Sequence, residues 1–213
     1  PGQDLRFEIE KVESSWNYIN KLWNIARYIL MQIEAYAIDD YTIHLEHLSL
    51  PDAYILSRFE SMQKEVNDNY DKFEFGEAAK ALYTFTWDEF ASWYIEMAKL
   101  SLAENDATKT QVTISVMASL LKDILKFLHP FMPFVTEEIY QKLPNVDAES
   151  IMIAPWPSSY NFYDESSIKD FEMIKELITK VRNVRNEYQV APSKPLDIYI
   201  ETSVGTKRIL EKK

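Results

Sequence analysis

The stretch from Phe73 to Leu102 limits what this chain can fold into more than any other part of the sequence. Apolar or aromatic side chains recur there every three or four residues, at Phe75, Ala79, Tyr83, Trp87, Phe90, Tyr94 and Met97. That spacing predicts one long helix. Six aromatic rings fall between Tyr83 and Tyr94, on more than one face, which is typical of a helix at the centre of a bundle. We expect most of these rings to form core, with one or two left at an edge to stack on a ligand.

Several further segments carry the same helical spacing, separated by proline or polar residues. They are residues 4–37, 51–69, 111–128, 133–143 and 168–188. The link between the helix at 51–69 and the central helix is short, so these two helices are predicted to be antiparallel neighbours. The predicted fold is therefore mostly α, an antiparallel helical bundle formed by residues 1–145.

The C-terminal third of the chain departs from this pattern. Residues 146–167 lack helical spacing and are predicted to be an extended strap over the bundle, anchored by Trp156. After the helix at 168–188, residues 196–201 alternate in polarity and predict a β-strand, so residues 168–213 form a small, truncated α/β appendage. A strand needs a partner, which is either residues 150–153 or a segment outside this chain.

The composition excludes several classes of site. Three glycines in 213 residues leave no room for a phosphate-binding glycine loop, and the absence of cysteine excludes disulfides, thiol nucleophiles and cysteine-ligated zinc. No apolar run is long enough to span a membrane, and no secretory signal opens the chain. Because the chain also lacks an initiator methionine, we expect it to be a piece of a longer, cytoplasmic protein.

The charge of the chain is uneven. The net charge of −11 argues against general binding of nucleic acids. However, residues 167–213 carry 10 basic and 7 acidic residues, whereas residues 1–166 carry 13 and 27. The first predicted helix is also unusual, because Lys21 and Arg27 are the only charges between Asn17 and Ile33, and Asn20, Asn24 and Arg27 share one face. This face is either simply solvated or kept free of acids so that a phosphate or a base edge can approach.

An ordered set of motifs gives the chain a family resemblance. The motifs lie at residues 2–7, 20–28, 71–79, 87–96, 129–140, 150–157, 181–187 and 192–194. Together they resemble the anticodon-binding domain of the class I aminoacyl-tRNA synthetases that charge aliphatic amino acids. The stretch 71–96 is most similar to the valyl-tRNA synthetases, and an isoleucyl or leucyl enzyme is the alternative.

The resemblance implies a module without a catalytic site of its own. The HIGH and KMSKS motifs of the catalytic domain are absent here, so ATP and magnesium are expected to act in a catalytic domain elsewhere in the parent chain. The implied partners are the anticodon stem-loop of tRNA(Val) and that catalytic domain, and we expect a monomer with no membrane contact. Candidate tRNA-binding residues are Lys21, Asn24 and Arg27, with Asn20 and Lys99 weaker, and Arg182, Arg185 and Lys194 for backbone phosphates.

Two other functions remain open on the sequence alone. The acidic charge and the core-like aromatic residues also fit a helical protein-interaction bundle with no RNA role. An enzyme is less well supported, because Glu137 and Glu138 do not share a helix face and no arrangement of nucleophile and base stands out. His44 and His47 are interpreted as surface histidines, since too few other ligands are available for a metal site.

Overall fold

The computed structural model describes residues 9–104, 106–191 and 193–210. The chain divides into two compact units, Pro1–Tyr163 and Asp164–Lys213, and each is described by itself. In the first unit the helices are α1 (Ile9–Ala35), α2 (Leu50–Asp71), α3 (Phe75–Thr84), η2 (Phe85–Tyr94), α4 (Ile95–Ala103), α5 (Ala107–Leu128) and α6 (Pro133–Tyr140), with short 3₁₀ turns η1 (Leu45–His47) and η3 (Ile151–Ile153). In the second unit they are α7 (Glu165–Glu187) and α8 (Val204–Leu210).

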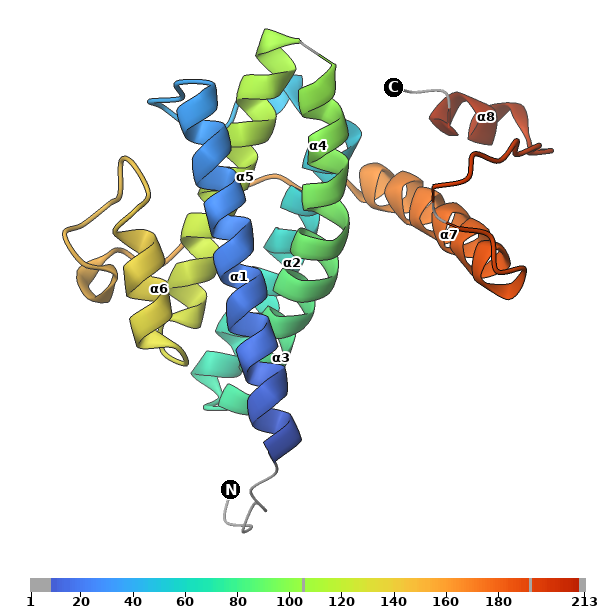
Figure 1. Ribbon diagram of the computed structural model, residues 1–213. Coiled ribbons are helices and arrows are strands. Elements are labelled where there is room, and N and C mark those ends of the chain that lie inside the picture. Colours follow the sequence, from blue (N-terminus) through green and yellow to red (C-terminus); the bar gives the residue numbers. More distant parts are fainter. Residues whose placement is uncertain (1–8, 105, 192, 211–213) are drawn as a thin grey trace. The chain divides into compact units, whose positions relative to one another are not determined.

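The first unit is an antiparallel bundle, as the sequence predicts. Helix α2 runs antiparallel to α1, the continuous helix α3–η2–α4 returns, and α5 runs back again (Figure 1). Helix α1 packs against α5 and η2. Helix α5 lies deepest, with 17 of its 22 residues buried. The start of the first predicted helix, residues 4–8, lies outside the described residues. Within the described residues, no helix is both long and apolar enough to cross a membrane.

The predicted central helix is present, but its middle is not α-helical. Residues Phe85–Tyr94 form a π-helix, in which hydrogen bonds span five residues, as in the bond from the Ile95 N–H to the Phe90 carbonyl. Of the six rings between Tyr83 and Tyr94, three are buried, namely Phe85, Phe90 and Tyr94. Tyr83 is exposed and Trp87 and Trp93 are half-buried, so fewer rings form core than expected. The segment packs against both α1 and α2. The π-helical register therefore determines which of its side chains face these two helices.

Helices α2 and α5 are each preceded by a capping residue whose side chain accepts hydrogen bonds from free backbone N–H groups of the first turn. Ser49 and Asp52 cap α2 reciprocally, and Asp106 accepts from two N–H groups at the start of α5. The Asp52 carboxylate is buried and also accepts from the Tyr94 hydroxyl at 2.7 Å and from the Thr113 hydroxyl at 3.1 Å. One carboxylate therefore ties α2, η2 and α5 together.

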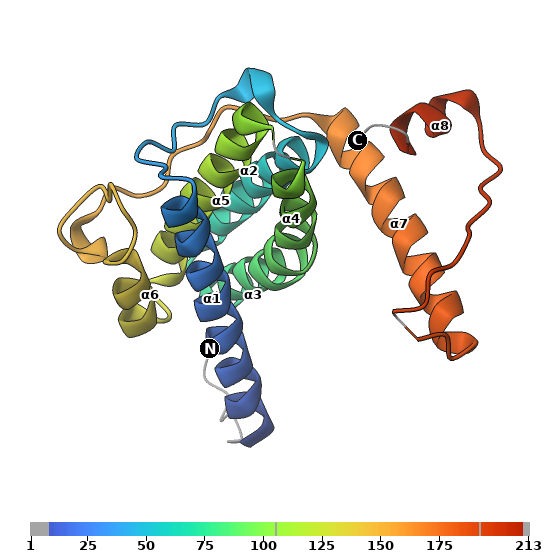
Figure 2. The same ribbon diagram turned by 45° about the horizontal axis from the view of Figure 1, so that its top comes forward.

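Residues 141–163 run across the bundle without long helices (Figure 2). The Trp156 ring packs edge-on against Phe127 with 4.9 Å between centroids, and its indole nitrogen donates to the Asn67 side chain at 2.9 Å. The Gln63 side chain donates to the Pro157 carbonyl at 2.9 Å. These contacts attach the segment to α2 and α5.

In the second unit, one prediction is wrong. Residues 196–201 form no strand, and no strand occurs among residues 9–104, 106–191 and 193–210. The proposed partner, residues 150–153, contains the 3₁₀ turn Ile151–Ile153, so it offers no free edge for pairing. The C-terminal part is thus helix α7, an extended segment and helix α8 rather than an α/β appendage. The boundary between units falls inside the predicted strap of 146–167, and the three-part division into domains at 145 and 167 stays a prediction.

Candidate nucleic-acid interface

A groove of about 560 Å³ separates α1 from the η2–α4 part of the central helix. Both walls belong to the first unit and lie side by side in Figure 1. The lining mixes amides, rings, two lysines and one carboxylate, contributed by Asn17, Asn20, Lys21, Asn24, Ile25, Tyr28, Trp87, Ala91, Ile95, Glu96 and Lys99. This is the chemistry with which proteins bind unstacked bases, by stacking and by hydrogen bonds to base edges.

Lys21 connects the two walls of the groove at one end. Its ammonium donates to the Trp87 carbonyl at 3.1 Å and to the Ser92 hydroxyl at 2.7 Å, and it lies 3.8 Å from the centre of the Trp87 ring. Burial lowers the pKa of the Lys21 ammonium, and the nearby Asp88 opposes that shift. Lys21 therefore joins α1 to the π-helical segment.

Three rings stack beside this lysine. The centroids of Tyr18 and Tyr83 are 4.9 Å apart, and those of Tyr83 and Trp87 are 5.8 Å apart with planes only 7° from parallel. Tyr18 is buried, whereas Tyr83 is exposed and Trp87 half-buried. Stacking on Tyr18 and Tyr83 fixes the plane of the Trp87 ring at the wall of the groove.

The opposite end of the groove combines Tyr28, Glu96 and Lys99. The Lys99 ammonium donates to a carboxylate oxygen of Glu96 at 2.7 Å and lies 5.4 Å from the centre of the Tyr28 ring. Burial, and after it the charge of Glu96, raises the pKa of the Tyr28 hydroxyl. The Tyr28 ring is half-buried and presents a stacking surface next to a hydrogen-bond acceptor.

Three asparagines, Asn17, Asn20 and Asn24, complete the α1 wall. All three are exposed, and no residue in the described part of the chain hydrogen-bonds their side-chain amides. An amide carries both a donor and an acceptor, the pair that can read the edge of a base. The α1 wall therefore offers three amides to a ligand.

The structure brings together four of the predicted site residues, Lys21, Asn24, Asn20 and Lys99. Arg27 is exposed on α1 but does not line the groove. Tyr28, Trp87 and Glu96 also line the groove but were not among the site residues predicted from the sequence. Tyr28 could have been selected from the sequence, because it follows Lys21 by seven residues, or two helical turns, and so shares its face of α1. Trp87 and Glu96 could not, because the sequence of α1 does not show which residues of another helix lie across the groove.

The other predicted residues, Arg182, Arg185 and Lys194, belong to the second unit. The Arg185 guanidinium donates to the carbonyl oxygens of Ala191 at 2.5 Å and Lys194 at 2.7 Å. Arg185 thus holds the loop that follows α7, which is a structural role in addition to the predicted contact with phosphate.

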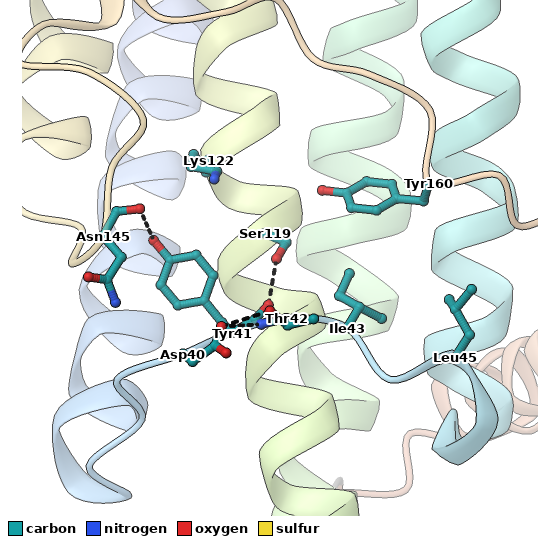
Figure 3. Close-up of a pocket in the computed structure, with 9 residues that line it drawn as sticks. All are labelled: Asp40, Tyr41, Thr42, Ile43, Leu45, Ser119, Lys122, Asn145 and Tyr160. Atoms are coloured by element: carbon teal, nitrogen blue, oxygen red, sulfur yellow. Dashed lines mark hydrogen bonds between the residues drawn. The ribbon is translucent and has the colours of Figure 1, made fainter.

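A second cavity of about 380 Å³ lies where the loop after α1 crosses α5 (Figure 3). The Tyr41 hydroxyl donates to the Asn145 carbonyl at 3.2 Å, and Ser119 donates to the Tyr41 carbonyl at 3.2 Å. Its one lysine, Lys122, is paired with Asp147 at 2.9 Å. The polar groups of this cavity are used to join three segments of the chain, so the groove beside α1 is the better candidate for a ligand. Among the described residues, no cluster of three His, Cys, Asp or Glu side chains could hold a metal ion.

Comparison with known proteins identifies the family. Residues 52–200 match the anticodon-binding domain of tRNA ligases. The chain is 45% identical over 203 residues to the valine–tRNA ligase of Oceanobacillus iheyensis, 44% over 204 residues to that of Bacillus subtilis, and 46% over 204 residues to that of Staphylococcus carnosus. Each alignment covers 95% of this chain and 23% of the relative, so the chain spans about a quarter of the length of these relatives. These matches confirm the resemblance seen in the sequence. The chain belongs to the anticodon-binding domain family of tRNA ligases.

Proposed function

We propose that this chain binds the anticodon stem-loop of tRNA(Val), as the monomeric tRNA-binding part of a longer, cytoplasmic valine–tRNA ligase. A catalytic part of the same polypeptide would attach valine with the help of ATP and magnesium. The observation that carries the proposal is the groove between α1 and η2–α4, which combines ring faces and unpaired amides in a chain of the anticodon-binding family.

The groove suits the bases that a valine anticodon must contain. Valine codons begin with G and then U, so the anticodon bases that pair with them are C and A, and both carry an exocyclic amino group. A carboxylate is a suitable acceptor for such a group. Glu96 offers one beside the Tyr28 ring, and Lys99 holds it in place. A base stacked on Tyr28 would therefore present its amino group to Glu96.

The charge of the chain supports reading of bases rather than general attraction to phosphates. Lys21 is engaged with Trp87 and Ser92, and Lys99 with Glu96, so the groove adds little net positive charge. Contacts to phosphates are proposed for Arg27, and for Arg182, Arg185 and Lys194 of the second unit. With at most four such contacts, the affinity should fall less steeply with salt than that of a protein that binds mainly through phosphates.

The proposal is tested by titrating the chain with tRNA(Val), and with the same tRNA carrying a changed anticodon, at two salt concentrations. Preference for the valine anticodon that survives at the higher salt supports base reading in the groove. Binding that ignores the anticodon and disappears with salt contradicts it. The same titration with tRNA(Ile) separates the valyl assignment from its isoleucyl alternative.

A pair of matched variants ties the result to the groove. Asn24→Ala removes an amide from the α1 wall and should weaken binding of the valine anticodon by roughly tenfold, as expected for one base contact. Gln111→Ala removes an exposed amide from the first turn of α5, outside the groove, and should leave binding unchanged. Equal effects of the two substitutions would argue against the groove.

A further inference from the structure

Five aromatic residues form one connected cluster at the surface of the first unit. Tyr70 lies at the end of α2, Phe73 and Phe75 at the link to α3, Phe131 between α5 and α6, and Trp156 in the crossing segment. We call Tyr70, Phe73, Phe75, Phe131 and Trp156 the aromatic patch. The Tyr70 ring contacts Phe75, Phe131 and Trp156 with centroid distances of 5.9, 6.1 and 5.5 Å, and Phe73 lies 6.1 Å from Phe75. The patch therefore joins three segments that are distant in the sequence.

The polar atoms of the aromatic patch have hydrogen-bond partners, while its rings are exposed. The Tyr70 hydroxyl donates to the Phe127 carbonyl at 3.1 Å, and the Trp156 indole donates to Asn67. The rings themselves remain open to solvent, with Phe73 77% exposed and Phe75 49% exposed. A connected set of rings held in fixed orientations and left uncovered is typical of a protein interaction surface.

Phe73 is the most exposed ring of the patch and follows the C-terminal cap of α2. Its φ of 59° lies in the left-handed region, where the Glu74 N–H donates to the Asn69 carbonyl at 2.8 Å and the Phe73 N–H donates to the Tyr70 carbonyl at 3.0 Å, which ends the helix. Among its ring contacts within the described chain, only that with Phe75 is present, so the ring adds little to the packing of this unit. Glycine is the usual residue at this position of a helix end, so the end of α2 does not require the exposed Phe73 ring.

The charges around the patch favour a protein over RNA as its occupant. Between residues 68 and 77 the chain carries four acids, Asp68, Asp71, Glu74 and Glu77, and one base, Lys72. This acidic rim repels phosphates and suits a basic protein surface. The links α2–α3 and α5–α6 lie toward the end of the bundle at which α1 begins (Figure 1).

We infer that the aromatic patch is the surface on which the catalytic part of the longer polypeptide docks. The inference rests on the proposed function and on the length of the relatives, in which the matched segment is 23% of the chain. Docking of the remaining three-quarters of such a ligase against this unit would hold the groove and the catalytic centre in a fixed arrangement on one tRNA. An apolar surface with a basic rim on the catalytic part would complement the patch.

Amide hydrogen exchange tests this inference directly. The exchange of residues 70–76 and 129–132 is measured in the isolated chain and in the polypeptide translated from the whole reading frame that encodes it. Docking on the patch should slow exchange at both links by about tenfold or more in the longer polypeptide. Equal exchange rates in the two proteins would overturn the inference.

The variant Phe73→Gly removes the most exposed ring without endangering the fold. Glycine adopts a positive φ freely, so the isolated chain should unfold at the same or a higher temperature. In the longer polypeptide, the protection of both links should be lost and the rate of valine attachment should fall. The control Leu100→Ser removes a side chain that is 63% exposed on α4, outside the patch, and should change neither.

The outcomes separate the two proposals. A longer polypeptide that charges tRNA with valine but leaves both links unprotected disproves the docking surface and keeps the proposed function. Protected links in a polypeptide that does not charge tRNA with valine disprove the proposed function and keep the docking surface. If Phe73→Gly and Leu100→Ser behave alike in the longer polypeptide, the patch is not the docking surface.

Discussion

The ammonium of Lys21 lies 3.8 Å from the centre of the Trp87 ring and donates a hydrogen bond of 3.1 Å to the carbonyl of the same residue. The Ser92 hydroxyl donates to that carbonyl as well, at 2.7 Å, across five residues of the π-helix. A π-helix changes the angular position of side chains relative to an α-helix. Lys21 and Ser92 together fix this register at the point where it forms the wall of the groove.

Replacing Lys21 by Met tests whether this lysine positions the groove or contacts RNA. The substitution removes two hydrogen bonds and a cation–π contact and should lower the free energy of unfolding by about 1–2 kcal/mol. Urea denaturation measures this change. Affinity for tRNA(Val) should fall, while its salt dependence should stay the same, because a positioning residue releases no counterions.

The control for this substitution is Lys80→Met, which removes a lysine whose side chain is 76% exposed and only loosely paired with Glu77. It should leave stability within about 0.5 kcal/mol of wild type. If the salt slope of tRNA binding falls by about one in Lys21→Met, then Lys21 contacts a phosphate and the positioning role is wrong.

Glu89 anchors the other side of the π-helix and should be more important for stability than any exposed ion pair. The Arg58 guanidinium donates to both carboxylate oxygens of Glu89, at 2.7 and 2.6 Å, and the Glu89 side chain is 11% exposed. Glu89→Gln removes the buried negative charge that accepts from the Arg58 guanidinium and should lower the free energy of unfolding by about 2 kcal/mol or more in urea denaturation. Glu176→Gln, which breaks the exposed pair with Lys180, should cost less than about 0.5 kcal/mol. Similar losses in the two variants would show that the buried pair is not an anchor.

Helix α7 should show a pH dependence at its first turn. Asp164 caps the helix by accepting from the Ser166 N–H. Hydrogen bonds from the Ser167 hydroxyl and then from the Ser166 hydroxyl lower the pKa of its carboxyl from 3.8 to about 2. Because the folded pKa lies below the unfolded value, the stabilising effect is complete above pH 3.8 and is lost as the pH falls toward 2 and below. Hydrogen exchange of the first-turn amides between pH 2 and 5, corrected for intrinsic rates, measures the effect.

The variant Asp164→Ala should abolish this pH dependence and weaken the first turn by about 1 kcal/mol at neutral pH. The control is Asp40→Ala, which removes an exposed carboxyl from a loop where Thr42 lowers its pKa in a similar way. It should leave exchange in α7 unchanged. A pH dependence of α7 that persists in Asp164→Ala would mean that another group is responsible.

The helices of the first unit could be predicted because their patterns are local. Predicted residues 51–69 and observed helix Leu50–Asp71 differ by one or two residues, since both the apolar spacing and the Ser49 cap can be read from the sequence. The π-helix could not be predicted, because Trp87 and Ser92 come together only after a change of register that the packing against α1 and α2 supports. The strand at 196–201 was wrong because alternation predicts a half-buried strand only where a partner exists.

The site was predictable along one helix but not across the groove. Lys21, Asn20 and Asn24 share a face of α1 and could be selected for that reason. The roles of Trp87 and Glu96 depend on which face of the central helix is turned toward α1. Tertiary packing determines which face is turned toward α1, and the local sequence of the central helix does not show it.

Tyr28 should bind RNA through its ring rather than its hydroxyl. Tyr28→Phe keeps the half-buried stacking surface and should leave the affinity for tRNA(Val) within about twofold of wild type, since only a hydroxyl is lost. Tyr28→Ala removes the ring and should cost about 1–3 kcal/mol of binding free energy. Fluorescence titration with labelled tRNA measures both. A loss in Tyr28→Phe as large as that in Tyr28→Ala would show that the hydroxyl is the important group.

Glu96 should decide which bases the groove accepts. A carboxylate accepts hydrogen bonds but does not donate them, so it favours the amino groups of C and A and disfavours the carbonyl oxygen that U carries in place of the amino group of C. Glu96→Gln introduces an amide that can also donate. We therefore expect the variant to keep most of its affinity for tRNA(Val) but to lose about tenfold of its discrimination against anticodons in which C is replaced by U.

The measurement is a set of competition titrations with tRNA(Val) and tRNAs changed at one anticodon base. The control Glu77→Gln alters an exposed carboxylate that pairs loosely with Lys80 and lies outside the groove, so it should leave discrimination unchanged. Because Lys99 loses its charged partner in Glu96→Gln, the double variant Glu96→Gln with Lys99→Met is also compared. If the double variant regains the discrimination of wild type, the freed lysine and not the missing carboxylate is the cause. If Glu96→Gln discriminates as well as wild type, the amino groups are recognised elsewhere, and the three asparagines of α1 become the candidates.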